Sequence, residues 1–157
     1  MNRKYIHKEL IDSTSSEIGR LALEGAPEGT IVTANKQTAG KGRRGRVWQS
    51  PKGTTISMSF CLEPELPTEK VSGITLAAAL SVAEAVFELT GKRAQIKWPN
   101  DIVLRGKKVC GILTEMFTKA GAIDYIIIGI GVNVHNRDFP EEIAQMATSI
   151  ELEIGEG

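Results

Sequence analysis

The stretch Tyr125-Ile126-Ile127-Ile128-Gly129-Ile130 is a continuous apolar run broken only by one glycine. Such a run is typical of a strand that is covered on both faces of its sheet, whereas a strand with one wet face alternates apolar and polar residues. The stretch therefore predicts a buried strand in a layered domain, with other elements packed on both of its sides.

Apolar periodicity predicts further elements around this strand. Residues 68–90 carry apolar side chains at steps of three and four, which predicts the clearest helix of the chain, ended by Gly91. Leu76, Leu80 and Phe87 widen its apolar stripe, so we expect burial on much of its surface. Strands are predicted over 4–11, 30–34, 54–60 and 95–98, a hairpin over 102–113, and short helices over 16–25 and 140–147. The predicted fold class is α+β, a mixed, largely antiparallel sheet with helices packed on it.

Composition narrows the function classes. The chain has 157 residues, 41% hydrophobic and 24% charged, which suits a single globular domain. Its 19 basic residues balance its 19 acidic ones, which argues against a dedicated nucleic-acid-binding protein. Cys61 and Cys110 lie in no CxxC or Cys/His cluster, so buried, inert thiols in a reducing compartment are expected. The N-terminus lacks the apolar run of a signal peptide and no apolar run approaches membrane-spanning length, so a cytoplasmic protein without a membrane partner is predicted.

A basic, glycine-rich loop follows the second predicted strand. The segment from Ala39 to Trp48 holds three glycines, four cationic side chains and a tryptophan. Glycine lets a ligand approach the backbone, successive N–H groups can form an anion site, and arginine matches phosphate or carboxylate geometry. The segment predicts a loop that closes over a nucleotide or an acidic small molecule. A basic surface turn or an arginine-glycine segment that binds RNA is the alternative.

A second charged segment is Lys97-Trp98-Pro99-Asn100-Asp101. Pro99 removes a ladder donor and restricts the residue before it, so the strand should end and turn there. The segment then places a cation, an amide and a carboxylate at one strand end, and Asp101 becomes a candidate Mg²⁺ ligand near phosphates. An ordinary turn at the end of a strand is the alternative interpretation.

Lys108 begins the strand that follows. Alternation puts Lys108 on the same face as Cys110 and Ile112, and a lysine that points to an apolar face needs a partner such as an anionic ligand. A solvated strand end is the alternative. Gly111 leaves room either for a ligand or for close packing.

Two further segments, 129–134 and 12–15 together with Gln37, complete the candidate site. In Gly129-Ile130-Gly131-Val132-Asn133-Val134 the glycines indicate either a bulge that lets Asn133 reach a ligand or close packing. The spacing is not that of a dinucleotide-binding fingerprint. Asp12-Ser13-Thr14-Ser15 and Gln37 offer hydroxyl and amide groups for a polar neutral ligand, although such residues more often cap helices.

These segments together resemble the biotin protein ligase family. The loop over 40–48 is similar to that family's glycine-arginine biotin-binding loop, and 97–101 is similar to its KWPND motif. Residues 107–115 and 129–134 resemble its lysine-containing strand and its late GxGxN strand, in the same order and spacing. The resemblance extends from about residue 5 to residue 150. Lys41 stands where the family often has arginine, which keeps the charge but loses the planar fork.

The resemblance implies an ATP- and Mg²⁺-dependent ligase. Biotin's carboxylate would attack the α-phosphate of ATP to give biotinyl-5′-AMP, and a lysine of a biotin carrier protein would then take the biotinyl group. Lys108 would bridge the biotin carboxylate and the α-phosphate. A lipoate or octanoate ligase of the same superfamily, and a module that binds biotin without transferring it, are the alternatives.

The resemblance also implies a set of site residues. Charge stabilisation in catalysis would fall to Lys108 and Arg43. The biotin-binding residues would be Ser13, Thr14, Ser15, Gln37, Gly40, Lys41, Gly42, Arg43, Lys108 and Gly111. The ATP- and adenylate-binding residues would be Arg46, Trp48, Lys97, Asn100, Asp101 and Asn133, with Asp101 as the possible Mg²⁺ ligand.

Residues 1–157 are interpreted as one catalytic domain of this family. We expect it to be incomplete at its C-terminus and to lack both a helix-turn-helix domain and a C-terminal β-barrel domain, so that no operator DNA is bound. Members of the family commonly dimerise through sheet edges, which makes a homodimer one option.

Overall fold

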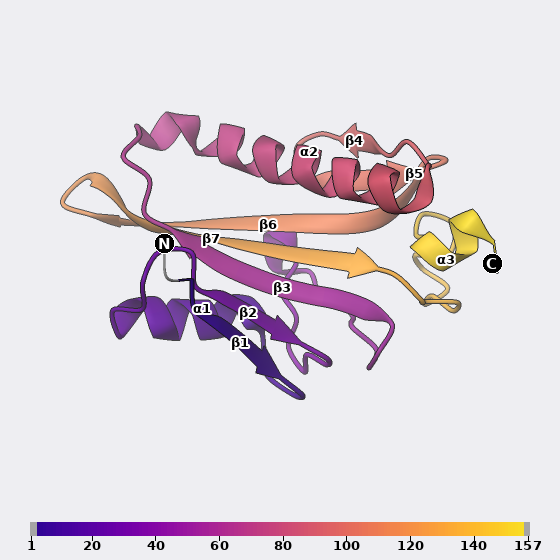
Figure 1. Ribbon diagram of the computed structural model, residues 1–157, viewed down its shortest axis with the longest axis horizontal. Coiled ribbons are helices and arrows are strands. Elements are labelled where there is room, and N and C mark those ends of the chain that lie inside the picture. The colour runs from indigo at the N-terminus through magenta and orange to yellow at the C-terminus, as the bar shows by residue number, and fades with distance from the viewer. Residues whose placement is uncertain (1–2, 156–157) are drawn as a thin grey trace.

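The computed structural model describes residues 3–155, which form a seven-stranded sheet with helices on both faces (Figure 1). The strand order is β1-β2-β3-β7-β6-β5-β4, and only β1 and β2 are parallel neighbours. The strands are β1 (Tyr5–Lys8), β2 (Ile31–Ala34), β3 (Thr55–Leu62), β4 (Gln95–Lys97), β5 (Asp101–Leu104), β6 (Lys107–Lys119) and β7 (Ala122–Asn133). The helices are α1 (Thr14–Leu23), α2 (Val71–Thr90) and α3 (Ile150–Ile154), with the 3₁₀ turns η1 (Arg43–Gly45) and η2 (Thr68–Lys70). The predicted α+β class with a largely antiparallel sheet is confirmed.

Strand β7 lies at the centre of this sheet, between β3 and β6. Its even-numbered residues from Ile126 to Val132 join the core under α2, whereas Tyr125 and Ile127 join the core under α1. Side chains alternate between the faces of a strand, so this pattern follows directly from the sequence. The apolar run is continuous because both faces are covered, as predicted.

Two apolar layers hold the helices to the sheet. Figure 1 shows α2 along one face and α1 along the opposite face. Cys61 and Cys110 are both free and buried in these layers, and burial raises the pKa of the Cys110 thiol to about 12. The prediction of buried thiols is confirmed, and burial makes the Cys110 thiolate scarce at neutral pH.

Two helix predictions differ from the structure. The predicted helix over 16–25 begins two residues earlier, because the Ser13 hydroxyl accepts from the backbone N–H of Ser16 and caps the helix there. The helix predicted over 140–147 is wrong. Residues 141–146 form turns instead. Hydrogen bonds such as the one from Ala147 N to Ile143 O are present there but do not continue into a regular helix. The helix of this region is α3.

The expectation that α2 is buried on much of its surface is also wrong. The sheet covers one face, through residues such as Ala79 and Val86, while Leu76, Leu80 and Phe87 lie on the exposed side. Within residues 3–155, no second element covers that side. The span Thr68–Thr90 is in fact long and apolar enough, by length and composition alone, to cross a membrane, contrary to the sequence-based expectation. Core helices of soluble proteins meet the same criterion.

A pair of substitutions tests this division of the apolar residues. Ile126→Ala should lower the free energy of unfolding by about 2–5 kcal/mol, because it leaves a cavity in the core under α2. Leu89→Ala should change it by less than about 0.5 kcal/mol, because Leu89 is 84% exposed. Urea unfolding of both variants measures the difference, and similar losses would show that Leu89 is covered in solution.

Candidate active site

Two adjoining cavities open beside the glycine-rich loop. The smaller has a volume of about 50 Å³ and lies between α1, the loop and the central strands. The larger, of about 580 Å³, lies between the loop, the 97–101 turn and the segment 136–147. Their shared wall consists of Gly42, Arg43, Trp48, Asn100 and Lys108. The two cavities are therefore separated mainly by two cations, an indole and an amide.

The end of the small cavity near α1 is a network of neutral polar groups. Gln37 Oε1 accepts from the backbone N–H and the hydroxyl of Thr14, at 2.8 and 3.1 Å. The Thr14 and Ser15 hydroxyls both pair with the hydroxyl of Ser59 on β3, at 2.8 and 2.9 Å. Ser13 lines the same cavity and caps α1. This network offers hydrogen bonds without a formal charge, which suits a polar, neutral ring system.

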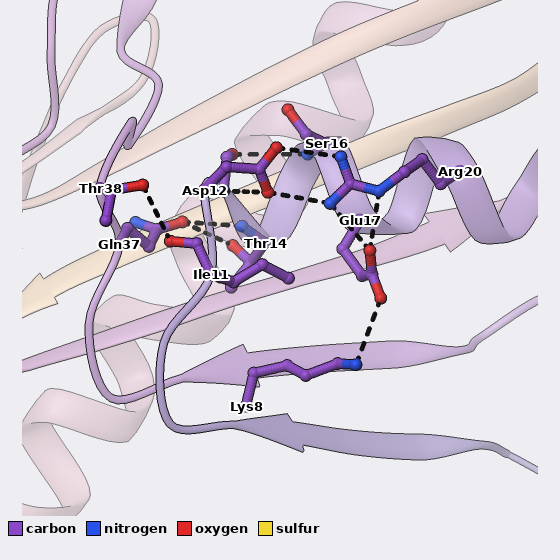
Figure 2. Close-up of polar contacts among 10 residues, drawn as sticks. Lys8, Ile11, Asp12, Thr14, Ser16, Glu17, Arg20, Gln37 and Thr38 are labelled. Carbon is purple, nitrogen blue, oxygen red and sulfur yellow. Dashed lines mark hydrogen bonds and ion pairs between the residues drawn. The ribbon is translucent and has the colours of Figure 1, made fainter.

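Charged residues outside the cavity support this polar end (Figure 2). Arg20 donates two hydrogen bonds to the Asp12 carboxylate, at 2.9 and 2.8 Å, and a third to Glu17 at 2.8 Å. Asp12 also accepts from the backbone N–H of Ser13 at 2.7 Å. The Arg20 guanidinium, together with that N–H, lowers the pKa of the Asp12 carboxyl to about 2. The start of α1 is thus fixed next to the residues that line the cavity.

Glycines on the central strands provide the floor of the site. Gly111 and Gly131 are direct cross-strand partners on β6 and β7. A Cβ on Gly131 would lie 2.6 Å from Nε1 of Trp48, and a Cβ on Gly129 would lie 2.6 Å from the Ser15 hydroxyl. The ladder on either side of these glycines is regular, so the bulge considered for this segment is absent and close packing is the reason for the glycines.

The glycine-rich loop is held against the site by backbone and side-chain contacts. Gly42 N donates to Arg46 O and Trp48 N donates to Gly40 O, which close the loop on itself. The Arg43 guanidinium donates to Asn100 Oδ1 at 2.9 Å, and Asn100 Nδ2 donates to Ile112 O at 3.0 Å. Arg43 is therefore tied through Asn100 to strand β6.

Lys108 occupies the boundary between the cavities. Its Nζ lies 2.8 Å from Asp101 Oδ1 and 5.6 Å from the centre of the Trp48 ring. The expectation that Lys108 shares a face with Cys110 and Ile112 is wrong, because a β-bulge shifts the register of β6 against β5. The bulge places Lys108 beside Gly111 on the cavity side and leaves Cys110 in the core.

Every predicted site residue lies at or next to the two cavities. The small cavity is lined by Ser13, Thr14, Ser15, Gln37, Lys41, Gly42, Arg43, Trp48, Asn100, Lys108 and Gly111. The larger one adds Arg46, Lys97, Asp101 and Asn133. Gly40 lines neither, but it lets the Trp48 backbone pass close to its own. Asn133 lines the larger cavity while its amide donates to Thr148 O at 3.1 Å.

Sequence reasoning missed the outer wall of the larger cavity. Asn136, Phe139 and Met146 lie there, in a segment without regular structure. This segment is held by backbone bonds from Lys108 N to Met146 O and from Thr148 N to Lys108 O. No motif or periodicity marks such residues, because their positions depend on a pairing between distant parts of the chain.

Asp101 is the candidate metal ligand that the site offers. Within residues 3–155, no group of three or more His, Cys, Asp or Glu side chains is arranged to hold a metal ion. Mg²⁺ is commonly held by one or two carboxylates together with substrate phosphates. Asp101, which lines the larger cavity together with Asp138 and Glu142, fits that mode of binding.

Comparison with known proteins agrees with this geometry. The profile of the Biotin/lipoate A/B protein ligase family matches residues 8–133. The bifunctional ligase/repressor BirA of Bacillus subtilis is 44% identical over 99% of this chain and 49% of its own length. The biotin–[acetyl-CoA-carboxylase] ligase of Mycobacterium tuberculosis is 34% identical over 91% of this chain and 53% of its own. The chain thus spans about half the length of these relatives.

A solved structure shows the same fold. The biotin protein ligase from Aquifex aeolicus in complex with biotin and ATP has a TM-score of 0.83 and 38% identity, covering 98% of this chain and 62% of that one. The sheet, the glycine floor and the two joined cavities define an α+β ligand-binding domain. The chain belongs to the biotin/lipoate A/B protein ligase family.

The Asp12–Arg20 pair predicts a pH dependence. Because its folded-state pKa is lowered from 3.8 to about 2, the Asp12 carboxylate stabilises the fold above about pH 4, and this contribution is lost as the pH falls toward 2. Asp12→Asn should remove this contribution and lower the free energy of unfolding near neutral pH by about 0.5–1 kcal/mol. The expected loss is small because the side chains of Asp12 and Arg20 are both nearly half exposed. Urea unfolding at about pH 2.5 and about pH 6 should show a smaller pH effect in the variant. An equal pH effect in both proteins would contradict this assignment.

A second prediction tests the glycine floor. Gly131→Ala should displace the Trp48 indole and cost about 1–3 kcal/mol of stability, because its Cβ has no room. Gly73→Ala on α2, where a Cβ meets nothing within 4 Å, should instead be neutral or stabilising. Tryptophan fluorescence in a Trp98→Phe background reports Trp48 alone, and an unchanged spectrum in Gly131→Ala would refute the close packing.

Proposed function

We propose that this chain activates biotin with ATP and transfers it to a lysine of a biotin carrier protein. The observation that carries the proposal is the shared wall, where Lys108 and Arg43 stand between a small polar cavity and a large one. A carboxylate and a triphosphate repel each other, so their reaction needs cations at the point where they meet. The wall supplies cations at that point.

The first half-reaction follows from this arrangement. Biotin's ureido ring would occupy the polar end formed by Thr14, Gln37 and Ser59, which directs its carboxylate toward Lys108. ATP would occupy the larger cavity with its α-phosphate at the same wall. A carboxylate oxygen attacks the α-phosphorus, the bond to the β-phosphate oxygen breaks, and pyrophosphate leaves. Lys108 and Arg43 stabilise the charge that develops, and the backbone of Lys41 and Gly42 closes the carboxylate side.

The second half-reaction needs no nucleophilic side chain of this protein. The amine of the carrier lysine attacks the carbonyl carbon of biotinyl-5′-AMP, the bond to AMP breaks, and an amide forms with loss of a proton. The loop and the Trp48 indole would shield the mixed anhydride from water until the carrier arrives. Trp48 lines both cavities, so it would contact the adenylate as well as the alkyl chain.

Mg²⁺ would be held by Asp101 and by the phosphates of ATP. When bound, it supplies charge neutralisation on the phosphates. Arg46, Lys97 and Asn133 border the same cavity and would bind the nucleotide. Several further points remain predictions. They are the carrier protein as acceptor, a cytoplasmic location, the absence of DNA and membrane partners, and a homodimer. The assignment of residues 1–157 to one catalytic domain is also a prediction.

A lipoate or octanoate ligase is the second candidate. Lipoate's dithiolane ring offers no amide-like hydrogen-bonding groups, so it could not hydrogen-bond to the network of Thr14, Gln37 and Ser59. Biotin's ureido group can hydrogen-bond to that network, which favours biotin.

The test is mass spectrometry of acyl-adenylates after incubation with ATP, Mg²⁺ and equal amounts of biotin and lipoate. Biotinyl-AMP alone is the expected product. Lipoyl-AMP alone would overturn the substrate assignment. No adenylate from a folded sample would contradict the proposed activation step, and biotinyl-AMP without transfer to a carrier domain would restrict the function to activation.

Lys108→Ala is expected to reduce the rate of biotinyl-AMP formation by about 10²–10³-fold, while biotin binding weakens much less. The reason is that Lys108 stabilises charge that develops between the two substrates. Lys107→Ala removes a neighbouring, exposed lysine and is the matched control. Single-turnover rates and biotin titration separate the two effects, and near-normal adenylation by Lys108→Ala would rule out its assigned role.

A further inference from the structure

One carboxylate outside the assigned site contacts the glycine-rich loop. Glu115 Oε1 on β6 lies 3.3 Å from Nζ of Lys41, which is 74 residues away in sequence. Gly111 and Leu113 line the small cavity, and Glu115 continues the same face of the strand by alternation. The pair therefore joins the loop to the sheet just beyond the cavity.

The Glu115 carboxylate is only partly exposed to solvent. Its second oxygen, Oε2, is buried and has no hydrogen-bond partner among the residues that the structure describes. A carboxylate in that environment loses hydration at one oxygen and depends on the cation at the other. The Lys41 ammonium supplies this compensation, so the side chain of Lys41 is directed to Glu115 and its backbone is left to face the ligand.

The loop has to move for a ligand to enter. Gly42 and Arg43 border the small cavity, whose volume of about 50 Å³ would hold roughly four ordered waters. A bicyclic ring with an alkyl chain needs more space than this. In the structure the loop lies against the sheet, and its contacts with Asn100 and Glu115 oppose the movement that entry of such a ligand requires.

Besides the packing of Trp48, two polar side-chain contacts connect the loop to the sheet at separate points. Arg43 bonds to Asn100 beside β5, and Lys41 pairs with Glu115 on β6. We propose that the Lys41–Glu115 ion pair is a latch that holds the glycine-rich loop closed, and that Glu115 is a positioning residue that controls how long the activated acyl-adenylate stays bound. The role in retaining the adenylate rests on the function proposed above, whereas the latch itself does not.

The latch is tested first without any ligand. Trypsin can cut the open loop after Arg43, Arg44 or Arg46, and its cleavage rate follows the population of the open form. Glu115→Gln should increase the rate about fivefold, as expected for a partly exposed ion pair. Glu84→Gln removes an exposed carboxylate on α2 and is the matched control, with no change expected. An unchanged rate in Glu115→Gln would overturn the latch.

A charge exchange tests the pair itself. Lys41→Glu and Glu115→Lys should each speed cleavage after Arg43, Arg44 and Arg46, because each places like charges together. The double variant restores opposite charges and should return the rate toward that of the unmodified protein. If the double variant is cleaved as fast as the single variants, these two residues do not form the latch.

The adenylate gives the functional readout. Glu115→Gln should release biotinyl-AMP about fivefold faster, with a smaller effect on the rate of its formation. Equal release rates in a protein that does form the adenylate would overturn the retention role. If the unmodified protein forms no adenylate while Glu115→Gln still speeds trypsin cleavage, the proposed function fails and the latch stands.

Discussion

The close approach of the loop and α1 to the central strands is the constraint on which the site depends. Strand β7 carries isoleucines on the face under α2 and, at Gly129 and Gly131, no side chain on the opposite face. These positions are filled instead by the Ser15 hydroxyl and the Trp48 indole. The same strand thus builds the core under α2 with one face. With the other it joins the core under α1 and, at the two glycines, receives the parts of the ligand site.

Electrostatics then divides the site into two regions with a cationic boundary. The polar end near α1 uses neutral hydroxyl and amide groups, and its charged support, Asp12 with Arg20, stays outside the cavity. Lys108 and Arg43 lie at the boundary. Lys108 is held by Asp101 and Arg43 by Asn100, and an anionic substrate can replace either partner. Ordering these groups before the substrates bind reduces the reorganisation that the reaction requires.

Much of this could be predicted from the sequence because the signals are local. The apolar run of β7, the periodicity of α2 and the clustered residues of the loop and of 97–101 each report on their own segment. The face of Lys108 was predicted wrongly because a β-bulge depends on pairing with β5. The exposed side of α2 was predicted wrongly because periodicity cannot show which apolar side chains find a partner.

Long-range contacts account for the parts that local patterns do not show. The segment 136–147 becomes a cavity wall through its pairing with Lys108, and turns replace the helix predicted there. The Lys41–Glu115 pair joins residues that have no shared motif. In both cases the residue types are ordinary, and only their positions in the folded chain give them a role.

The most direct measurement is a crystal structure with a sulfamoyl analogue of biotinyl-5′-AMP, in which the reactive anhydride is replaced by a stable linkage. We expect the bicyclic ring at Thr14, Gln37 and Ser59 and the adenosine in the larger cavity. We also expect Lys108 Nζ at the linkage between them. An analogue bound elsewhere, or a Lys108 that contacts no part of the linkage, would contradict the account.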